Sequence, residues 1–238
     1  MTLAGALVSV VLVGCAQTPG LPRGAAADSV PRQAPSPVPG EVLTGTPDGR
    51  PSASPRETPK PPRREPEPRR SFLTVPRLGL DAVPVVRYPG TPDDAEGTRI
   101  QNGGPTASPR GRGGGVGPGQ VGNFIVTGHR TSHAAPFRDL PVLRRGDRVR
   151  VRSGNAVYVY RITATRQTSF RSERSLAEQS AAVPGRPGAK PVRPMVTLST
   201  CATPEDHAAG NYWSDRFGNP EHRIDKIGVL VAERRFDP

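Results

Sequence analysis

Val196-Thr197-Leu198-Ser199-Thr200-Cys201 is the stretch of sequence that decides the fold. A short run of apolar and β-branched residues is typical of a buried β-strand. This run ends in a lone thiol, since the only other cysteine, Cys15, lies in an apolar N-terminal segment. A free cysteine is either a small apolar filler or a nucleophile. The surrounding sequence has to decide between these two interpretations.

A second buried-type strand, residues 124–127, ends at Gly128-His129. A cysteine nucleophile needs a proton carrier for the leaving amine and positive charge where the oxyanion develops. His129 is the candidate proton carrier, and an arginine can supply a permanent cation. Because His129 and Cys201 both directly follow apolar strands, we expect them to project from the same barrel rim.

Other strand-like runs occur between turn signals, which predicts a mainly β domain with the strands of a barrel or sandwich. The sequence between Tyr88 and Gln120 is rich in Gly, Pro, Asp and Ser and is expected to be a long connection. Helical periodicity is weak, and residues 172–179 form the best short helix candidate. The expected strands are 72–76, 83–86, 124–127, 148–152, 157–162, 194–200 and 227–232.

Composition divides the chain into three parts. Residues 1–16 carry no charge and form a hydrophobic membrane anchor or signal remnant. Residues 17–70 hold 14 of the 30 prolines and no aromatic residue, so we expect a disordered Pro-rich linker or stalk. All 11 aromatic residues follow, so residues 71–238 form the one folded domain.

The N-terminal segment has two explanations. It is shorter than the roughly 20 residues of a spanning helix and lacks basic residues before it, which fits a start site placed too late. Alternatively, Leu12-Val13-Gly14-Cys15 resembles a lipobox, with Cys15 as the lipidation candidate. Either explanation places the folded domain on the extracellular face of a cell membrane.

The folded domain is basic, with 24 Lys and Arg against 15 Asp and Glu. Such charge suits nucleic acid, anionic wall polymers or lipid headgroups. The arginines are scattered and few aromatic residues lie among them, so nucleic-acid binding is the weakest of the three. A GC-rich genome would also enrich arginine without any functional cause.

Two separated motifs resemble the sortase family of cysteine transpeptidases. Thr197-Leu198-Ser199-Thr200-Cys201 resembles the Thr-Leu-x-Thr-Cys motif, and Thr127-Gly128-His129-Arg130 with Ala135-Pro136-Phe137 resembles the histidine region. This version of the second motif, followed by Gly146-Asp147, is most like actinobacterial class E sortases. The resemblance covers residues 71–238 in the correct order.

The resemblance implies an eight-stranded β-barrel with short helices. It also implies cleavage of a C-terminal sorting signal, similar to LAxTG or LPxTG, between Thr and Gly. Cys201 would form a thioacyl intermediate, His129 would move protons between the departing and incoming amines, and Thr200 would orient substrate or oxyanion. The partners would be secreted proteins bearing that signal and a peptidoglycan amine as acceptor, with the enzyme a monomer in the cell-wall zone.

The catalytic arginine departs from the family pattern, because an insert over residues 202–223 separates Cys201 from the last strand. Arg223 lies just before that strand, while Arg216 lies within the insert. We favour Arg223 because a residue carried by a strand is better preorganised.

The remaining polar and aromatic residues receive weaker assignments. Tyr212 and Trp213 either line a substrate groove or fasten the insert to the barrel. His207 and His222 are expected to be solvated, and His133 is not expected to pair with His129 on a metal. The sequence predicts neither a metal nor a cofactor. Two alternatives to a transpeptidase stay open: a catalytically silent wall-binding lipoprotein, and a cysteine hydrolase that uses water as acceptor.

Overall fold

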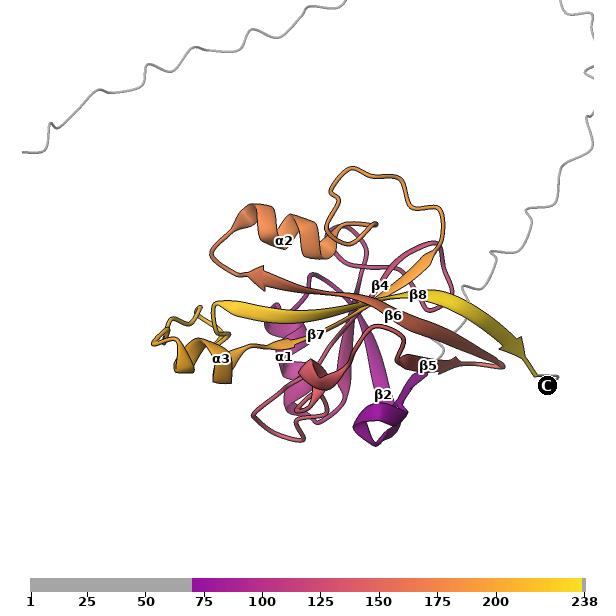
Figure 1. Cartoon of the computed structure of the whole chain (residues 1–238), viewed down its shortest axis with the longest axis horizontal. Helices are drawn as coiled ribbons and strands as arrows, with labels where there is room; N and C mark the ends of the chain where they lie inside the picture. Colours follow the sequence, from indigo (N-terminus) through magenta and orange to yellow (C-terminus); the bar gives the residue numbers. More distant parts are fainter. Residues whose placement is uncertain (1–69, 237–238) are drawn as a thin grey trace, which may run out of the picture. The chain divides into compact units, whose positions relative to one another are not determined.

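The computed structural model describes residues 70–236, in which eight strands close into a barrel (Figure 1). Around the barrel the order is β1-β2-β3-β4-β7-β8-β6-β5, and β5 pairs with β1. The prediction of a mainly β, eight-stranded barrel is therefore confirmed. The predicted anchor (1–16) and all of the predicted linker except Arg70 lie outside the described residues.

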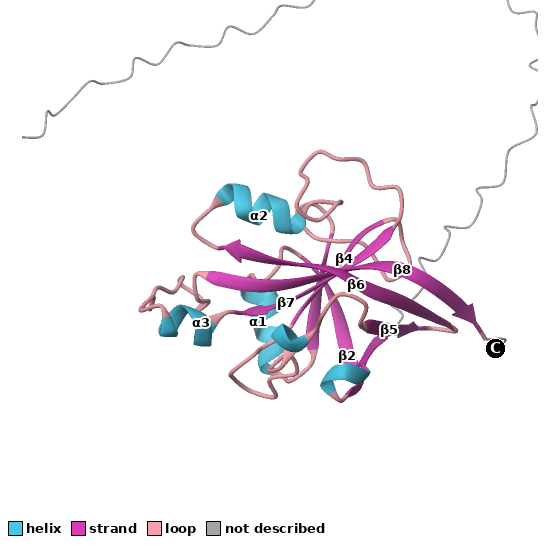
Figure 2. Cartoon of the chain, in the orientation of Figure 1, coloured by secondary structure: helices cyan, strands magenta, loops and turns pink. Residues whose placement is uncertain are grey.

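The strands alternate with short helices that lie outside the barrel (Figure 2). The strands are β1 Ser71–Val75, β2 Leu80–Pro89, β3 Thr106–Arg110, β4 Gly122–Thr127, β5 Arg148–Ser153, β6 Ala156–Ser169, β7 Pro194–Cys201 and β8 His222–Arg235. The helices are α1 Ala95–Asn102, α2 Glu173–Ser180 and α3 Thr203–Ala208, with 3-10 turns η1 Pro76–Leu78 and η2 Leu140–Val142.

Alternation along the strands fills the barrel with apolar side chains. On β7, Val196 and Leu198 are fully buried in the same core as Phe124 and Val126 of β4. Successive strand residues point to opposite faces, so Thr197, Ser199 and Cys201 belong to the outer face of β7. The core therefore fixes which residues of β7 face outward.

β7 lies between one parallel and one antiparallel neighbour. It pairs in parallel with β4, with Thr127 opposite Ser199, and antiparallel with β8, with Cys201 opposite Arg223. In Figure 1 the start of β8 lies beside α3, at the end of the barrel opposite to the C-terminus. The ends of β4 and β7 and the start of β8 thus meet at one rim.

The expectation of a long connection between Tyr88 and Gln120 is wrong. The segment contains α1, which begins after Asp94, whose side chain accepts a hydrogen bond from Gly97 N. It also contains β3, whose sequence Thr-Ala-Ser-Pro-Arg has no β signature. Tertiary pairing overrides these weak local preferences, because β3 adds in parallel to β2 along its whole length.

Side chains, more than a backbone ladder, join β3 to β4. Ala107 and Thr127 are the one residue pair between these strands in the described sheet. Ser108 Oγ of β3 donates to Ile125 O of β4 at 2.5 Å, and Thr127 Oγ1 of β4 donates to Ala107 O of β3 at 3.5 Å. We call this short junction between β3 and β4 the seam. Because it has almost no backbone ladder, Pro109 is accommodated in β3 although proline has no N–H to donate.

The other predicted elements occur, often longer than expected. The helix expected over residues 172–179 is α2, and Ser172 caps it by accepting from Ser175 N at 3.2 Å. β8 begins at His222, so Arg223 lies inside the strand and not before it. Part of the insert after Cys201 is helical, as α3.

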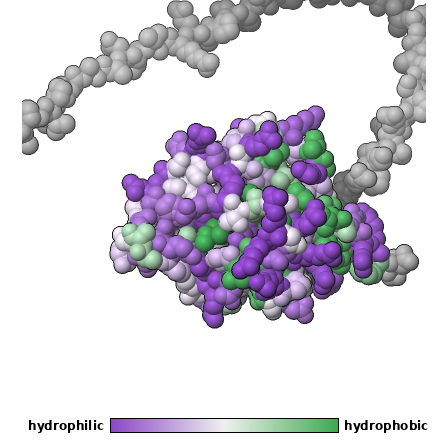
Figure 3. Space-filling view, in the orientation of Figure 1, coloured by the Kyte–Doolittle hydropathy of each residue, from purple (hydrophilic) through white to green (hydrophobic). Residues whose placement is uncertain are grey.

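The surface is largely polar. Figure 3 shows hydrophilic residues over most of the face it draws, with smaller hydrophobic areas among them. Among the described residues, no helix has the length and apolar character needed to cross a membrane.

Truncating the centre of β7 should destabilise the barrel. We expect Leu198→Ala to lower the free energy of unfolding by about 3 kcal/mol, because Leu198 is fully buried and its loss leaves a cavity. Val231→Ala on β8, a position 44% exposed, should cost less than about 1 kcal/mol. Urea unfolding followed by circular dichroism measures both, and equal losses would contradict this account of the core.

Candidate active site

His129, Cys201 and Arg223 come from three adjacent strands at one rim of the barrel. Thr127 of β4 is level with Ser199 of β7, so His129 and Cys201 each stand two residues further along parallel chains. Arg223 is directly opposite Cys201 on β8. Residues level with one another share a face, so all three belong to the outer face. The structure thus brings together the three residues that the sequence singled out.

Thr200 points the other way. Its side chain is buried, and Oγ1 donates to Gly128 O at 2.8 Å, while Gly128 N donates to Ser199 O at 3.2 Å. A Cβ at Gly128 would lie 2.8 Å from the Phe137 ring, so glycine is needed for this close approach. In this geometry Thr200 fixes the spacing between the strand ends that carry His129 and Cys201.

The Arg223 side chain is buried and contacts the thiol. Nη1 donates to Cys201 Sγ, and Nη2 donates to Asn219 Oδ1 at 2.8 Å. Nε lies 3.2 Å from Asp93 Oδ2, and the guanidinium carbon lies 4.6 Å from the Phe170 ring centre. Burial alone would lower the pKa of Arg223, but Asp93 and Cys201 outweigh it and the net pKa is raised.

The alternative arginine does not reach the sulfur. Arg216 is exposed, and its guanidinium stacks over the Phe217 ring at 4.7 Å. Of the two arginines that the sequence left open, the structure places only Arg223 against Cys201.

The surroundings of Cys201 favour the neutral thiol, and those of His129 favour the neutral imidazole. Burial raises the pKa of the Cys201 thiol, and the charge of Arg223 opposes this only in part. Burial also lowers the pKa of His129, followed by the effect of His133, whose ring stacks on it at 5.0 Å. His129 Nε2 lies 2.7 Å from Asn102 Oδ1 on α1. At neutral pH the resting pair is therefore a thiol and an imidazole.

Arg130 links the histidine loop to the cysteine strand. Nη1 donates to Cys201 O at 3.3 Å and to Glu205 of α3, and Nη2 donates to Glu205 Oε1 at 2.9 Å. This bidentate pair ties the residue after His129 to the helix after Cys201. Glu205 is thus in a salt bridge with Arg130.

A group of buried polar side chains lies on the same outer face, two residues from Cys201 along β7 and two residues from Arg223 along β8. Asp225, two residues after Arg223, accepts from Thr168 Oγ1 at 2.6 Å and from Gln179 Nε2 at 3.0 Å. Gln179 also donates to Ser199 Oγ at 3.1 Å. Burial raises the pKa of Asp225. Gln179 of α2 is therefore hydrogen-bonded to both β7 and β8.

The sequence did not single out three residues that contact the candidate catalytic groups. They are Asp93, Asn102 and Asn219. Each lies in a helix or loop with no motif of its own. The contact partner of Asp93 is 130 residues further along the chain, so only the fold reveals the pair.

The insert after Cys201 departs from expectation at its histidine. His222, expected to be solvated, has Nδ1 2.6 Å from Asp206 Oδ1, and Asp206 itself is buried. Tyr212 is 72% exposed and its ring lies 4.7 Å from that of His207, while Trp213 is half-buried. In the structure neither aromatic residue lies against the thiol.

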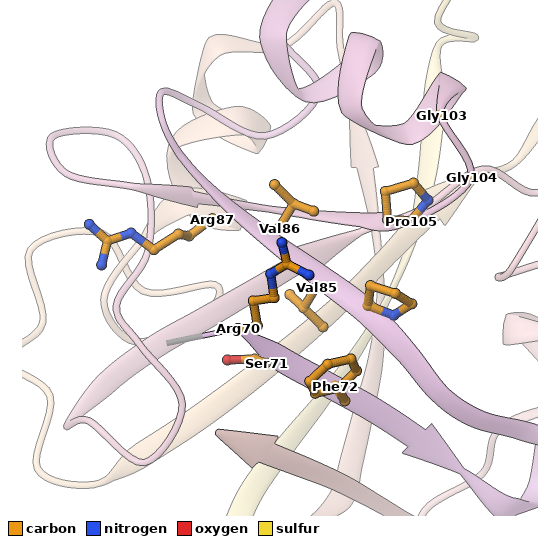
Figure 4. Close-up of a pocket in the computed structure, with 10 residues that line it drawn as sticks. Arg70, Ser71, Phe72, Val85, Val86, Arg87, Gly103, Gly104 and Pro105 are labelled. Carbon is orange, nitrogen blue, oxygen red and sulfur yellow. The ribbon is translucent and has the colours of Figure 1, made fainter. Parts of the chain in front are cut away.

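Two cavities lie near the site, and neither is lined by Cys201, His129 or Arg223 themselves. One of about 420 Å³ is bounded by the loop after β2, by α2 and by the insert, and Asp93, Phe170 and Gln179 line it. A second of about 630 Å³ lies where β1, β2 and the turn after α1 meet (Figure 4). Its lining is mainly apolar, with Phe72 and Val86 near Arg70. The first adjoins Arg223, and the second begins one residue after Asn102, on the His129 side.

The described part of the chain contains no group of three or more His, Cys, Asp or Glu side chains arranged to hold a metal ion. The rings of His133 and His129 are stacked, with 5.0 Å between their centroids.

A family comparison accounts for this arrangement. Residues 73–216 match the model of the sortase domain, and the match includes His129 and Cys201. The chain belongs to the sortase family. The resemblance expected from the two motifs is confirmed. Arg223 lies beyond the matched segment, so its assignment depends on the geometry alone.

Among curated relatives, Sortase SrtE1 of Streptomyces coelicolor is 34% identical over 86 residues, which are 36% of this sortase. The matched region spans only 23% of that relative's length. Sortase E from Streptomyces avermitilis has 26% identity and a TM-score of 0.50, covering 69% of this chain and 89% of that one. The SrtA sortase from Actinomyces oris shares the fold at 20% identity, with a TM-score of 0.54 and coverage of 71% and 85%.

The stacked histidines give a prediction for this sortase. We expect His129 to titrate below pH 6.5, and His133→Ala to raise its midpoint, because the variant removes both burial and a neighbouring positive charge. Imidazole NMR signals recorded against pH measure the midpoint. An unchanged His129 midpoint in His133→Ala would contradict the stacked arrangement.

Proposed function

We propose that this sortase is a class E-like cysteine transpeptidase that cuts a C-terminal sorting signal between Thr and Gly and joins the protein to a cell-wall amine. The observation that carries the proposal is the contact of the buried Arg223 guanidinium with Cys201 Sγ, at the strand end adjacent to His129. Nucleophile, proton carrier and cation lie on one face. A wall-binding protein without catalysis has no need for all three.

The first half of the reaction is acyl transfer to sulfur. Cys201 Sγ attacks the threonine carbonyl carbon, and its proton passes to His129. The oxyanion that forms takes hydrogen bonds from Arg223. When the intermediate collapses, the Thr–Gly C–N bond breaks and the protonated His129 gives its proton to the departing glycine amine. A thioester to Cys201 remains.

The second half reverses these roles. An amine from the wall attacks the thioester carbonyl and His129 takes the proton of that amine. The C–S bond then breaks, Cys201 leaves as the thiolate, and His129 returns the proton to the sulfur. The thioester keeps the acyl group activated for an amine, whereas attack by water would release it as a free acid. Because burial raises the pKa of Cys201 and lowers the pKa of His129, both surroundings disfavour the reactive thiolate–imidazolium pair.

The two cavities suit two substrates. We assign the sorting signal to the 420 Å³ cavity, because Phe170 and Asp93 in its wall contact Arg223 and thus adjoin the oxyanion position. The acceptor amine enters from the side of His129, towards the cavity that follows Asn102. In this arrangement the departing glycine amine lies on the His129 side of Cys201, and the incoming amine later takes the same place.

The proposed setting is the outer face of a Gram-positive, actinobacterial cell membrane, with the domain in the cell-wall zone. The clients are secreted proteins with an LAxTG-like or LPxTG-like signal, and the acceptor is a peptidoglycan amine. The proposal includes a membrane anchor in residues 1–16, a Pro-rich spacer over residues 17–70 and a monomeric enzyme.

A fluorogenic LAxTG peptide tests the activity. We expect Cys201→Ala to lower cleavage at least about 10³-fold, since no nucleophile remains. Arg223→Ala should lower kcat by about 10²-fold through loss of oxyanion stabilisation. Arg216→Ala should change KM at most, because Arg216 is exposed and does not touch the sulfur.

Two controls separate the alternatives. Equal cleavage by the wild type and Cys201→Ala, or none by either, refutes the enzyme and leaves the wall-binding protein. Addition of a glycine-type amine should convert the product from free acid to amide, detected by mass spectrometry. If only the acid forms, the protein is a hydrolase. Loss of activity in Arg216→Ala alone would make Arg216 the catalytic arginine.

Lipid attachment at Cys15 is tested in cells. If the lipobox is used, growth with a radioactive fatty acid should label the full chain, and Cys15→Ser should remove the label because serine cannot form the thioether. An unlabelled wild-type chain excludes the lipoprotein and leaves the hydrophobic segment as the anchor.

A further inference from the structure

Asp93 occupies a position that local sequence preferences do not favour. It lies in the loop between β2 and α1 with φ of +59°, the left-handed region that non-glycine residues seldom adopt. Its side chain is 95% buried, at a relative exposure of 5%. A strained and buried carboxylate persists only where its surroundings hold it.

Three contacts hold Asp93. Oδ1 accepts from Gln101 Nε2 at 2.9 Å, Oδ2 lies 3.2 Å from Arg223 Nε, and the backbone oxygen accepts from Asn219 Nδ2 at 3.3 Å. Asn219 at the same time accepts from Arg223 Nη2. Asp93 and Asn219 therefore both contact the Arg223 guanidinium, and a hydrogen bond connects them to each other.

This leaves one guanidinium nitrogen for chemistry. Nη2 donates to Asn219 and Nη1 donates to Cys201, while Nε forms an ion pair with Asp93 at 3.2 Å without a hydrogen bond. The nitrogen at the sulfur is the one that meets the substrate carbonyl as the sulfur attacks. Of the other two, Nη2 is held by a hydrogen bond and Nε by the charge of the Asp93 carboxylate.

We propose that Asp93 is a positioning residue that holds Arg223 against Cys201 and offsets its positive charge in the resting enzyme. The proposal rests on the transpeptidase function proposed above. Its physical basis is that a fully buried guanidinium needs a compensating charge, and that charge decides how strongly the cation attracts the thiolate.

The other charged groups around Cys201 have partners of their own. Glu205 on α3 pairs with Arg130, which follows His129. Asp225, deeper on β8, accepts hydrogen bonds from Thr168 and Gln179, and burial raises its pKa. Asp93 is therefore the carboxylate that compensates Arg223 directly. In agreement, the Asp93 charge acts to raise the pKa of the Cys201 thiol, against the lowering effect of Arg223.

The test measures the thiol without any peptide substrate. The rate of iodoacetamide alkylation is followed against pH in the full chain, and the Cys201-containing peptide is quantified by mass spectrometry to exclude Cys15. We expect Asp93→Asn to lower the alkylation midpoint by about one pH unit, because the uncompensated Arg223 then favours the thiolate. Asp94→Asn, which removes a neighbouring carboxylate and retains the helix cap, should leave the midpoint as in the wild type.

A second pair of variants covers the case in which Asp93→Asn does not fold. Arg223→Gln should raise the midpoint, since Asp93 then faces the thiol alone. The double variant Arg223→Gln with Asp93→Asn buries no unpaired charge, and its midpoint should lie about one pH unit below that of Arg223→Gln. An equal midpoint in these two variants, or an unchanged or raised midpoint in folded Asp93→Asn, overturns the proposal.

Activity then separates positioning from charge. With the LAxTG peptide, Asp93→Glu should lower kcat about tenfold with little change in KM, because the variant keeps the compensating charge but its longer side chain displaces Arg223. A wild-type kcat would refute the positioning role. Absence of peptide cleavage by the wild type would refute the proposed function while the alkylation results still decide the role of Asp93.

Discussion

The register of β7 between its two neighbours is the constraint on which the site depends. Parallel pairing of β4 with β7 brings the chain that leads into His129 beside the chain that ends at Cys201, and antiparallel pairing with β8 makes Arg223 level with Cys201. A shift of one residue would turn each of these side chains to the inner face and expose the core residues beside them. Packing of Val196 and Leu198 inside the barrel therefore also fixes the chemistry outside it.

The second constraint is electrostatic. A fully buried arginine is costly unless its surroundings compensate it, and here a carboxylate, an amide and an aromatic ring surround it. These groups come from three separate segments: the loop after β2, the insert before β8 and the loop after β6. The arrangement explains why loops that differ widely from any strand pattern nevertheless carry buried polar residues.

The sequence predicted those parts of the fold and of the site that strand patterns and motifs determine. Cys201 and His129 follow apolar strands, and Ser172 marks the start of α2, so local patterns were sufficient there. The preference for Arg223 over Arg216 came from strand position, and the geometry places Arg223 at the sulfur. The catalytic roles themselves remain predictions.

The sequence failed where distant contacts override local preference. β3 is a polar segment containing Pro109 that becomes a strand only because β2 offers it a partner. Asp93 and Asn219 lie in loops rich in turn residues, where no spacing or period marks a buried pair. Their importance follows from Arg223, which they meet only in the folded chain.

The short seam between β3 and β4 divides the site into two halves. His129, Cys201 and Arg223 belong to the strands on one side, whereas Asp93 and Asn102 belong to the chain between β2 and β3 on the other. Local opening of a barrel is easiest where the backbone ladder is shortest. Asp93 and Asn102 therefore reach Arg223 and His129 across this seam, so an opening there would release both contacts at once.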